Sequence, residues 1–242
     1  TDVMCTGHHA AVSAGVEAGD AAVSIRGINK ARDGEQSFAF LVDGILITNP
    51  SAFNREFDDL AQIEIVKGPQ SALYGRSAIA GAIIVQTRKP TDEFEAGVKL
   101  QGGQYDTFFG SGYVSGPLIE GQLWGRLHAN YRTTDGQFRD SFLDANAVDN
   151  LENYNIDGRL VWEPNDQLQI DTKLRYSEVP DAGAIRFNQS FGFFEDVNDH
   201  DFVWQQNIRP VNEQETVEFS IKADYEMEWA TATTWFLYNN ID

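Results

Sequence analysis

The residues that could do chemistry are few in this sequence, and their spacing argues against catalysis. Cys5 lies close to His8 and His9, but this spacing matches no standard zinc pattern, and adjacent histidines seldom converge on one ion. No Ser-His-Asp or paired-carboxylate arrangement rises above chance. We therefore predict no catalytic residue, no metal site and no cofactor.

A long connection from 178 to 214 combines aromatic and acidic side chains. Aromatic rings beside carboxylates can cage a ligand or hold a cation, and a connection of this length suggests a function. The alternative is an ordinary loop whose rings pack on each other. The candidate ligand residues are Phe187, Phe191, Phe194, Glu195, Asp199, His200 and Trp204.

Composition narrows the function classes further. The chain of 242 residues has a formal net charge of -19, so it lacks the basic surface of a nucleic-acid-binding protein. It contains 16 Phe, 8 Tyr, 5 Trp and 21 Gly but only 7 Pro, which favours a β-rich fold with tight turns. No run of about 18 apolar residues predicts a transmembrane helix, whereas transmembrane strands leave only a weak alternating signal.

Residues 1–90 are predicted to form a compact α/β unit. The dipeptide Asp43-Gly44 is a turn signal that predicts a hairpin between the segments on either side of it. The other elements expected here are short strands and one short helix. The strands are expected at 23–27, 38–42, 62–66 and 81–87, and the helix at 54–60.

From residue 94 onward the pattern changes to alternation with a period of two. Apolar residues such as Leu123, Leu127 and Tyr131 fall on one face, and Arg126 and His128 fall on the other. The segments are about 9–11 residues long, the length that a tilted strand needs to cross a bilayer. About seven strands are expected, at 96–102, 107–115, 122–133, 154–162, 167–177, 215–225 and 230–239.

Such alternation fits either a soluble β-sandwich or a transmembrane barrel. Two features favour the barrel: short turns alternate with long polar connections, and aromatic residues end the apolar faces, as interfacial girdles do. The aromatic residues are Tyr131, Trp162, Tyr176 and Tyr225. In a barrel the lumen would be lined by Arg126, His128, Arg159, Lys173 and Arg175.

Bacterial single-chain barrels have an even number of strands, at least eight, and an unclosed barrel would expose a strand edge to lipid. With about seven strands expected, we interpret the sequence as truncated at its C-terminus.

Residues 59–87 closely resemble the end of the plug of TonB-dependent receptors. The matching elements are a strand that runs into Gly68-Pro69, the Leu73-Tyr74-Gly75 turn, the Ala78–Ile83 step and a strand that closes at Thr87. Upstream, Ile25-Arg26-Gly27 and Val42-Asp43-Gly44 resemble two further plug motifs in the same order. Together these motifs are specific, whereas any one of them alone would be weak.

The same residues can also be explained by backbone conformation alone, without the family resemblance. Gly68 and Gly75 stand where the chain reverses, and glycine allows the positive φ that such turns require. Pro69 fixes φ just after a strand, and Gly81 lets two backbones approach closely. These are demands of a small sheet rather than of chemistry.

The resemblance implies a mainly β fold, in which part of a small α/β plug, 1–90, precedes part of a transmembrane antiparallel barrel, 94–242. The plug would fill a large barrel of the 22-stranded type. A ligand, most commonly a ferric siderophore, would bind at the outer face and be released inward. The implied location is the outer membrane of a Gram-negative bacterium.

The implied partners are the TonB protein, a small-molecule ligand such as a metal chelate, and outer-membrane lipid, with no nucleic acid. TonB would pull a segment missing here, and the full-length receptor would be a monomer. No TonB-contacting box is found near Thr1, and the first part of the plug is missing.

Three basic residues occupy plug positions of interest. By the resemblance, Arg26 and Lys67 would form ion pairs with acidic residues of the barrel wall and latch the plug. Lys67 stands where Arg is usual, so a bidentate pair would be lost. Arg76 either reaches the lumen or covers its turn. For Arg26 and Lys67 the alternative is a solvated surface charge at a strand end.

Other functions stay open at this point. The cargo could instead be cobalamin, a glycan or another non-iron ligand. A receptor that senses its ligand and relays a signal would need a periplasmic signalling domain before the plug. A passive porin would lack a plug, which the segment 25–87 argues against.

Overall fold

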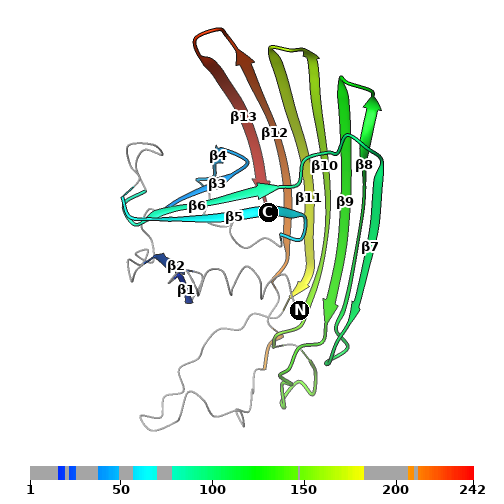
Figure 1. Ribbon diagram of the computed structural model, residues 1–242. Helices are drawn as coiled ribbons and strands as arrows, with labels where there is room; N and C mark the ends of the chain where they lie inside the picture. The colour runs from blue at the N-terminus through cyan, green and yellow to red at the C-terminus, as the bar shows by residue number, and fades with distance from the viewer. Residues whose placement is uncertain are drawn as a thin grey trace. The chain divides into compact units, whose positions relative to one another are not determined.

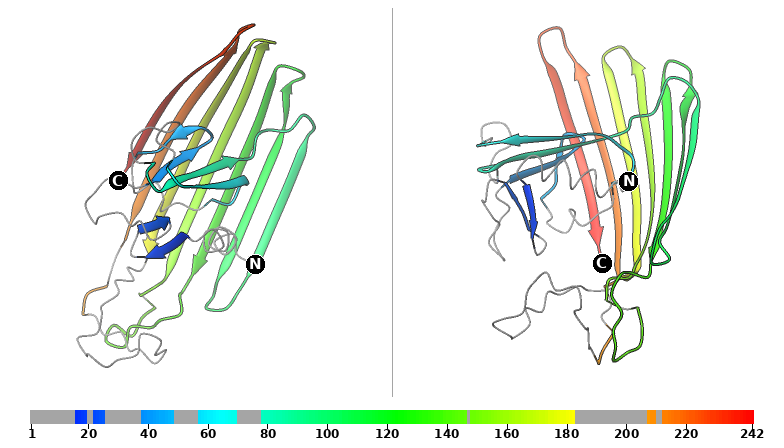
Figure 2. Two further views of the ribbon diagram at one scale, coloured as in Figure 1. Left: turned by 60° about the vertical axis from the view of Figure 1, so that its left-hand side comes forward. Right: turned by 60° about the horizontal axis from the view of Figure 1, so that its bottom comes forward.

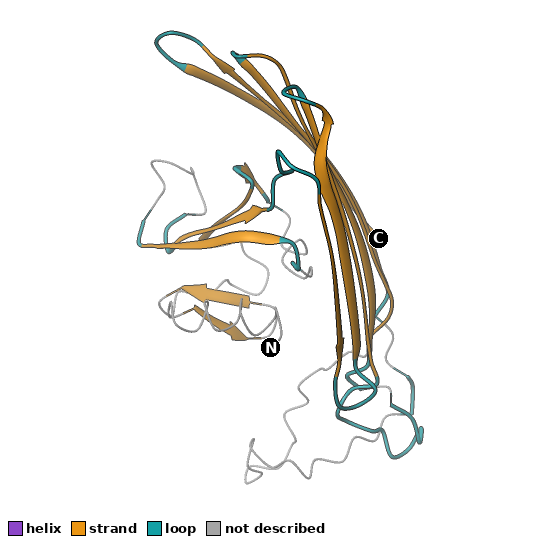
Figure 3. Cartoon of the chain, turned by 45° about the vertical axis from the view of Figure 1, so that its right-hand side comes forward, coloured by secondary structure: helices purple, strands orange, loops and turns teal. Residues whose placement is uncertain are grey.

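A computed structural model describes residues 16–19, 22–25, 38–48, 57–69, 78–146, 148–182, 207–209 and 212–242; in the first two ranges only the backbone is described. The chain divides into two compact units, Thr1–Lys89 (unit 1) and Pro90–Asp242 (unit 2). In the described ranges the elements are strands and turns (Figure 3), and none is a helix able to span a membrane.

Unit 1 contains a hairpin and a four-stranded sheet. Strands β1 (Val16–Gly19) and β2 (Ala22–Ile25) pair antiparallel. The larger sheet has the order β4-β3-β6-β5, in which β3 and β6 run parallel and the outer pairs run antiparallel. Its strands are β3 (Phe38–Val42), β4 (Ile45–Leu46), β5 (Leu60–Lys67) and β6 (Gly81–Thr87).

The central strands of this sheet are apolar because both of their faces are covered. Every residue of β3 is buried, as expected of a strand packed on both sides. The core cluster comprises Ala39, Leu41, Ala78 and Ala82, with Leu46, Val66 and Ile84 packed against it. Strands β3 and β6 have the predicted bounds. The helix predicted at 54–60 lies partly outside the described residues, and its last residue, Leu60, belongs to β5.

Unit 2 is one seven-stranded antiparallel sheet in which each strand pairs with the next along the chain. Figures 1 and 2 show the strands side by side, and Figure 3 shows that the sheet is curved. Its strands are β7 (Glu95–Gly102), β8 (Phe108–Ile119), β9 (Leu123–Thr134), β10 (Leu151–Asn165), β11 (Leu168–Ala182), β12 (Gln214–Glu226) and β13 (Thr231–Ile241). Seven strands at these places confirm the prediction from alternation.

The connections of unit 2 differ at the two ends of the sheet. At one end, which we call the short-turn end, the strands are joined by 120–122, 166–167 and 227–230. At the other, the long-loop end, the connections are 103–107, 135–150 and 183–213. This alternation of short and long connections is the pattern predicted from the sequence.

The two faces of this sheet differ in chemistry. We call the face that carries Arg126, His128 and Arg159 the inner face, and the face that carries Leu127 and Leu160 the outer face. Side chains alternate between the two faces along each strand, so every residue is placed by its position. The inner face is polar and largely buried, whereas the outer face is apolar and exposed.

Candidate functional site

The turn between β3 and β4 is tied to the end of β6. Asp43 and Gly44 have positive φ angles of 51° and 84°. Asp43 Oδ1 accepts a hydrogen bond from the Thr87 amide (2.9 Å), and its Oδ2 accepts one from Thr87 Oγ1 (2.8 Å). We call this contact the Asp43–Thr87 clamp. The sequence placed both residues in plug motifs, but it gave no signal that the motifs touch.

Two glycines shape the start of β6. Gly68 has a φ of 96°, and its amide donates to the Ala80 carbonyl at 3.0 Å. Gly81 has a φ of 150°, and a Cβ built there would lie 2.2 Å from the Val66 carbonyl oxygen. That distance is far below van der Waals contact, and the obstacle is backbone, so this close approach requires glycine.

Two predicted residues at the end of β5 and just after it have exposed side chains. Lys67 ends β5 and lies opposite Gly81 in the strand register, and Pro69 follows the turn at Gly68. Because Lys67 is exposed, the ion pair predicted for it with the barrel wall stays a prediction.

Several predicted site residues lie outside the described residues. In unit 1 they are Arg26, Gly27, Tyr74, Gly75 and Arg76, together with Cys5, His8 and His9. In unit 2 they are Phe187, Phe191, Phe194, Glu195, Asp199, His200 and Trp204. Within the described ranges, no three His, Cys, Asp or Glu side chains are grouped so that they could hold a metal ion.

Buried charged groups on the inner face pair across adjacent strands. Asp157 on β10 lies between His128 on β9 and Arg175 on β11. Its carboxylate is 3.7 Å from His128 Nδ1 and 3.5 Å from Arg175 Nε. Asn155 lies two residues before Asp157 on β10 and is fully buried. It donates to Asn130 Oδ1 at 2.8 Å. Pairing of this kind offsets the cost of removing charged groups from water.

Arg159 and Asp171 form a bidentate pair on the same face. Arg159 Nε is 3.0 Å from Asp171 Oδ1, and Nη2 is 2.5 Å from Oδ2. The guanidinium-bearing residue is only 6% exposed, whereas the next residue, Leu160 on the outer face, is 45% exposed. A sheet in a water-soluble protein has the opposite arrangement, with leucine buried and arginine exposed.

A second kind of contact holds cations over aromatic rings on the inner faces of β7, β8 and β9. The Lys99 ammonium and the Arg132 guanidinium lie 5.0 and 5.1 Å from the Phe109 ring centre. The Arg126 guanidinium lies 4.2 Å from the ring centre of Tyr113. All Lys and Arg residues of the seven strands are on the inner face, namely Lys99, Arg126, Arg132, Arg159, Lys173, Arg175 and Lys222.

A row of tyrosines marks the outer face near the long-loop end. Tyr131, Tyr154 and Tyr176 stand on successive strands, and the rings of Tyr154 and Tyr176 are 6.2 Å apart. The Tyr131 hydroxyl donates to Glu152 at 3.0 Å, and those of Tyr154 and Tyr176 donate to Glu178. Each ring is therefore held with its hydroxyl at a polar boundary, as interfacial tyrosines are.

Trp162 and Tyr225 are exposed on the outer face near the short-turn end. The outer-face positions between the two aromatic rows hold apolar residues, glycines, alanines or threonines. The segment from Tyr154 to Trp162 has about the length that a tilted strand needs to cross the hydrocarbon layer. Exposed apolar residues and buried charges favour the barrel over the soluble sandwich.

The connection between β9 and β10 has a backbone fixed by its own aspartates. The Asp149 carboxylate accepts hydrogen bonds from the amides of Gln137 (2.7 Å) and Phe138 (2.9 Å). Gly136, with a φ of 80°, leaves the space that this carboxylate occupies, because a Cβ there would lie 2.2 Å from Asp149 Oδ1. The base of the loop is therefore closed by side-chain contacts.

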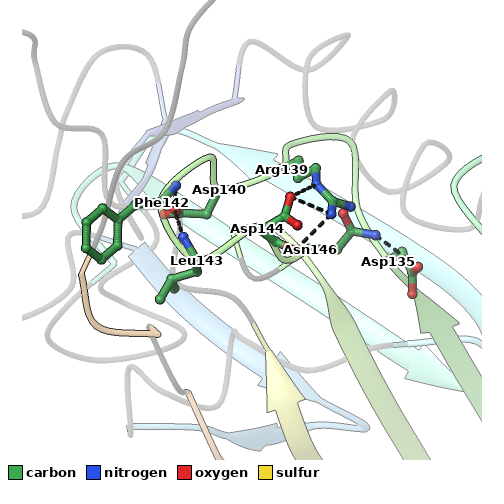
Figure 4. A network of polar contacts seen from close by, with 7 residues as sticks. All are labelled: Asp135, Arg139, Asp140, Phe142, Leu143, Asp144 and Asn146. Carbon is green, nitrogen blue, oxygen red and sulfur yellow. Dashed lines mark hydrogen bonds and ion pairs between the residues drawn. The ribbon is translucent and has the colours of Figure 1, made fainter.

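The tip of this connection is held in the same way (Figure 4). Asp140 Oδ1 accepts hydrogen bonds from the amides of Phe142 (2.8 Å) and Leu143 (2.9 Å). Arg139 donates to Asp144 through Nε and Nη2. Sequence reasoning missed these contacts; aspartate is common in turns because it bonds to nearby amides, and that was the available signal.

Comparisons with known proteins place these features in a family context. Residues 6–82 match the model of the TonB-dependent receptor plug domain. The siderophore receptor PirA from Acinetobacter baumannii is 34% identical over 121 residues, which cover 46% of this chain and 16% of that protein. The ferrioxamine B receptor of Salmonella typhimurium is 30% identical over 126 residues, covering 52% and 17%. The chain thus spans about a sixth of the length of these curated relatives.

Solved structures share the fold over a larger part of the chain. The ferric yersiniabactin uptake receptor FyuA from Yersinia pestis superposes with a TM-score of 0.68 and 18% identity, covering 91% of this chain and 35% of that one. The match includes the strands of unit 2 as well as unit 1. Residues 6–82 are therefore similar to the plug domain of TonB-dependent receptors, and the described strands share the fold of the matched receptor structure.

Proposed function

We propose that this chain acts as part of a longer receptor that takes up a ferric siderophore across the bacterial outer membrane with energy supplied through TonB. One observation carries the proposal: a plug-domain match over 6–82 is followed directly by a seven-stranded sheet with buried charges and exposed apolar residues. The cargo class is supported by the relatives, which are named as siderophore and ferrioxamine B receptors.

The outer face supports the proposed location. An apolar band that is bounded by aromatic rows and carries no cation suits a lipid environment. If the outer face contacts lipid, the long-loop end would lie outside the cell, because long connections face outward in such barrels. The short-turn end would then face the periplasm, where TonB supplies energy.

The predicted site residues fit this proposal as follows. Arg26 and Lys67 would hold the plug in place through ion pairs with the barrel wall, and Arg76 would cover its turn. The aromatic and acidic residues of 183–206 would contact the ligand at the outer face. The role proposed is transport, and no catalytic step is assigned to any residue.

Growth assays test the proposal. The full-length receptor that contains this sequence would be expressed in a siderophore-deficient Gram-negative host lacking its own ferric receptors. We expect growth on iron-limited medium with at least one ferric siderophore from a panel that includes ferrioxamine B, and none in a matched TonB-null host. Growth that does not depend on TonB would refute the proposal, as would the absence of growth with every siderophore.

A further inference from the structure

The turn between β7 and β8 has an unusual backbone at an aromatic residue. Tyr105 and Asp106 both have positive φ, at 58° and 50°. The Thr107 amide donates to the Gln104 carbonyl at 3.2 Å and so closes a two-residue hairpin turn. Turns of this type favour Asn-Gly or Asp-Gly, because most side chains are strained at positive φ.

A hairpin turn with a preferred pair of residues occurs elsewhere in the same chain. The hairpin between β3 and β4 has positive φ at Asp43 and Gly44, a preferred pair. Among the described residues, the non-glycine positions with positive φ are Asp43, Tyr105, Asp106 and Asp144. Aspartate tolerates this conformation, but a bulky aromatic residue there is an outlier.

Neighbouring groups hold Tyr105 in this conformation. Its carbonyl accepts hydrogen bonds from the Asp135 amide (3.0 Å) and from Thr134 Oγ1 (3.4 Å). Thr134 Oγ1 is also 2.8 Å from Thr107 Oγ1, on the other side of the turn. The turn is thus joined to the base of the 135–149 connection, which its own aspartates hold. A backbone outlier fixed by its surroundings is typical of functional positions.

The fold gains little from this tyrosine side chain. The residue is 50% exposed, and no ring or hydrogen-bond contact of its side chain is found within the described part of the chain. Asparagine would suit the backbone better and would lose only the covered half of the tyrosine surface. The position lies at the long-loop end, where the proposed function has the ligand enter.

We propose that Tyr105 is a specificity-determining contact for the ligand, and that its ring stacks on the organic part of a ferric chelate. This inference rests on the proposed function. Tyrosine offers a large amphipathic surface at a small cost in conformational entropy, and here the strained turn fixes its direction before the ligand arrives.

The test uses the full-length receptor with Tyr105→Asn and, as a matched control, Asp106→Asn in the same turn. Affinity for ferrioxamine B and ferripyoverdine is measured by tryptophan fluorescence quenching, and the thermal midpoint by calorimetry. Tyr105→Asn is expected to leave the midpoint unchanged or to raise it slightly, because relief of backbone strain offsets the lost contact surface, and to weaken binding of the chelate that the wild type binds by about tenfold. Asp106→Asn is expected to change the affinity by less than about twofold.

Each other outcome has a distinct meaning. If Tyr105→Asn binds as tightly as the wild type, or lowers the thermal midpoint, the inference is wrong and Tyr105 is a structural residue. An equal loss of affinity in Asp106→Asn would overturn it as well, since the turn rather than the ring would then matter. If the wild-type receptor binds neither chelate, the inference is wrong for these two ligands. The growth panel then shows whether the proposed function also fails.

Discussion

At the residue scale, a few side chains join segments that are far apart in the sequence. Asp43 accepts two hydrogen bonds from Thr87, which lies 44 residues later. Gly81 allows β6 to start against the Val66 carbonyl. Both features could be predicted as motif positions, because turn dipeptides and strand-ending residues have local signals. Their contacts could not, because a single sequence does not show which turn meets which strand.

Thr87→Val tests the clamp. Valine keeps the shape of threonine but leaves the Asp43 carboxylate without its hydroxyl donor, so we expect the free energy of unfolding to fall by about 1.5–3 kcal/mol. Urea denaturation of the full-length receptor in detergent measures it. Thr233→Val is the matched control, because Thr233 on β13 donates to Asp224 on β12 in an exposed pair. A loss no larger than that of the control would show that the clamp adds nothing.

Gly81→Ala tests the close approach in unit 1. A Cβ would meet the Val66 carbonyl oxygen at 2.2 Å, and backbone cannot move aside cheaply. We expect a loss of roughly 3 kcal/mol or more, or failure to fold. Gly68→Ala is the control: its φ of 96° is strained for alanine, but nothing lies within 4 Å of the added methyl group, so about 1–2 kcal/mol is expected. Equal losses would contradict this interpretation.

At the element scale, the alternation of apolar and polar residues located all seven strands of unit 2. It placed the end of one strand at 177 and the start of another at 154, whereas β11 continues to Ala182 and β10 begins at Leu151. The reason is physical: beyond the tyrosine row polar and apolar residues no longer alternate between the faces, while the backbone pairing continues. The sequence did not predict the Tyr105-Asp106 turn, because neither of its two central residues is glycine.

The Arg159–Asp171 pair joins β10 to β11. Substitutions in this pair test whether the charged groups of the inner face are buried and paired. Arg159→Met leaves a buried carboxylate unpaired and should cost about 3–5 kcal/mol, whereas the double replacement with Asp171→Leu should recover much of that loss. Loss of the exposed Arg139–Asp144 pair, by Arg139→Met, should cost less than about 1 kcal/mol. Urea denaturation in detergent measures all three variants. A double variant no more stable than Arg159→Met would argue against a buried pair.

The outer face can be tested by placing a charge on it. Ile221 on β12 lies midway between Tyr225 and Val217, the register partner of Tyr176, and arginine there should destabilise the receptor in lipid by about 2–4 kcal/mol. Asn240→Arg, on the outer face at the end of β13, should cost about 0–1 kcal/mol, because charge is tolerated near the interface. Folding titrations into liposomes compare the two. Similar costs at both positions would argue against a lipid-facing band.

At the scale of the whole molecule, two observations from different units support one function. The family match concerns unit 1, and the reversed polarity concerns unit 2. Their order along the chain is the order that the motif resemblance implied. The strand cations lie on the inner face, where carboxylates such as Asp157 and Asp171 pair with them, so they are compatible with a net charge of -19.

The most direct test of the central claim separates binding from uptake. Cells that express the full-length receptor are given a siderophore that supports growth in the panel, loaded with radioactive iron, on ice and at growth temperature, with TonB and without it. We predict surface binding in both strains and accumulation of iron only in the TonB-containing strain at growth temperature. Equal accumulation without TonB would contradict the account, because the channel would then be open without its energy source.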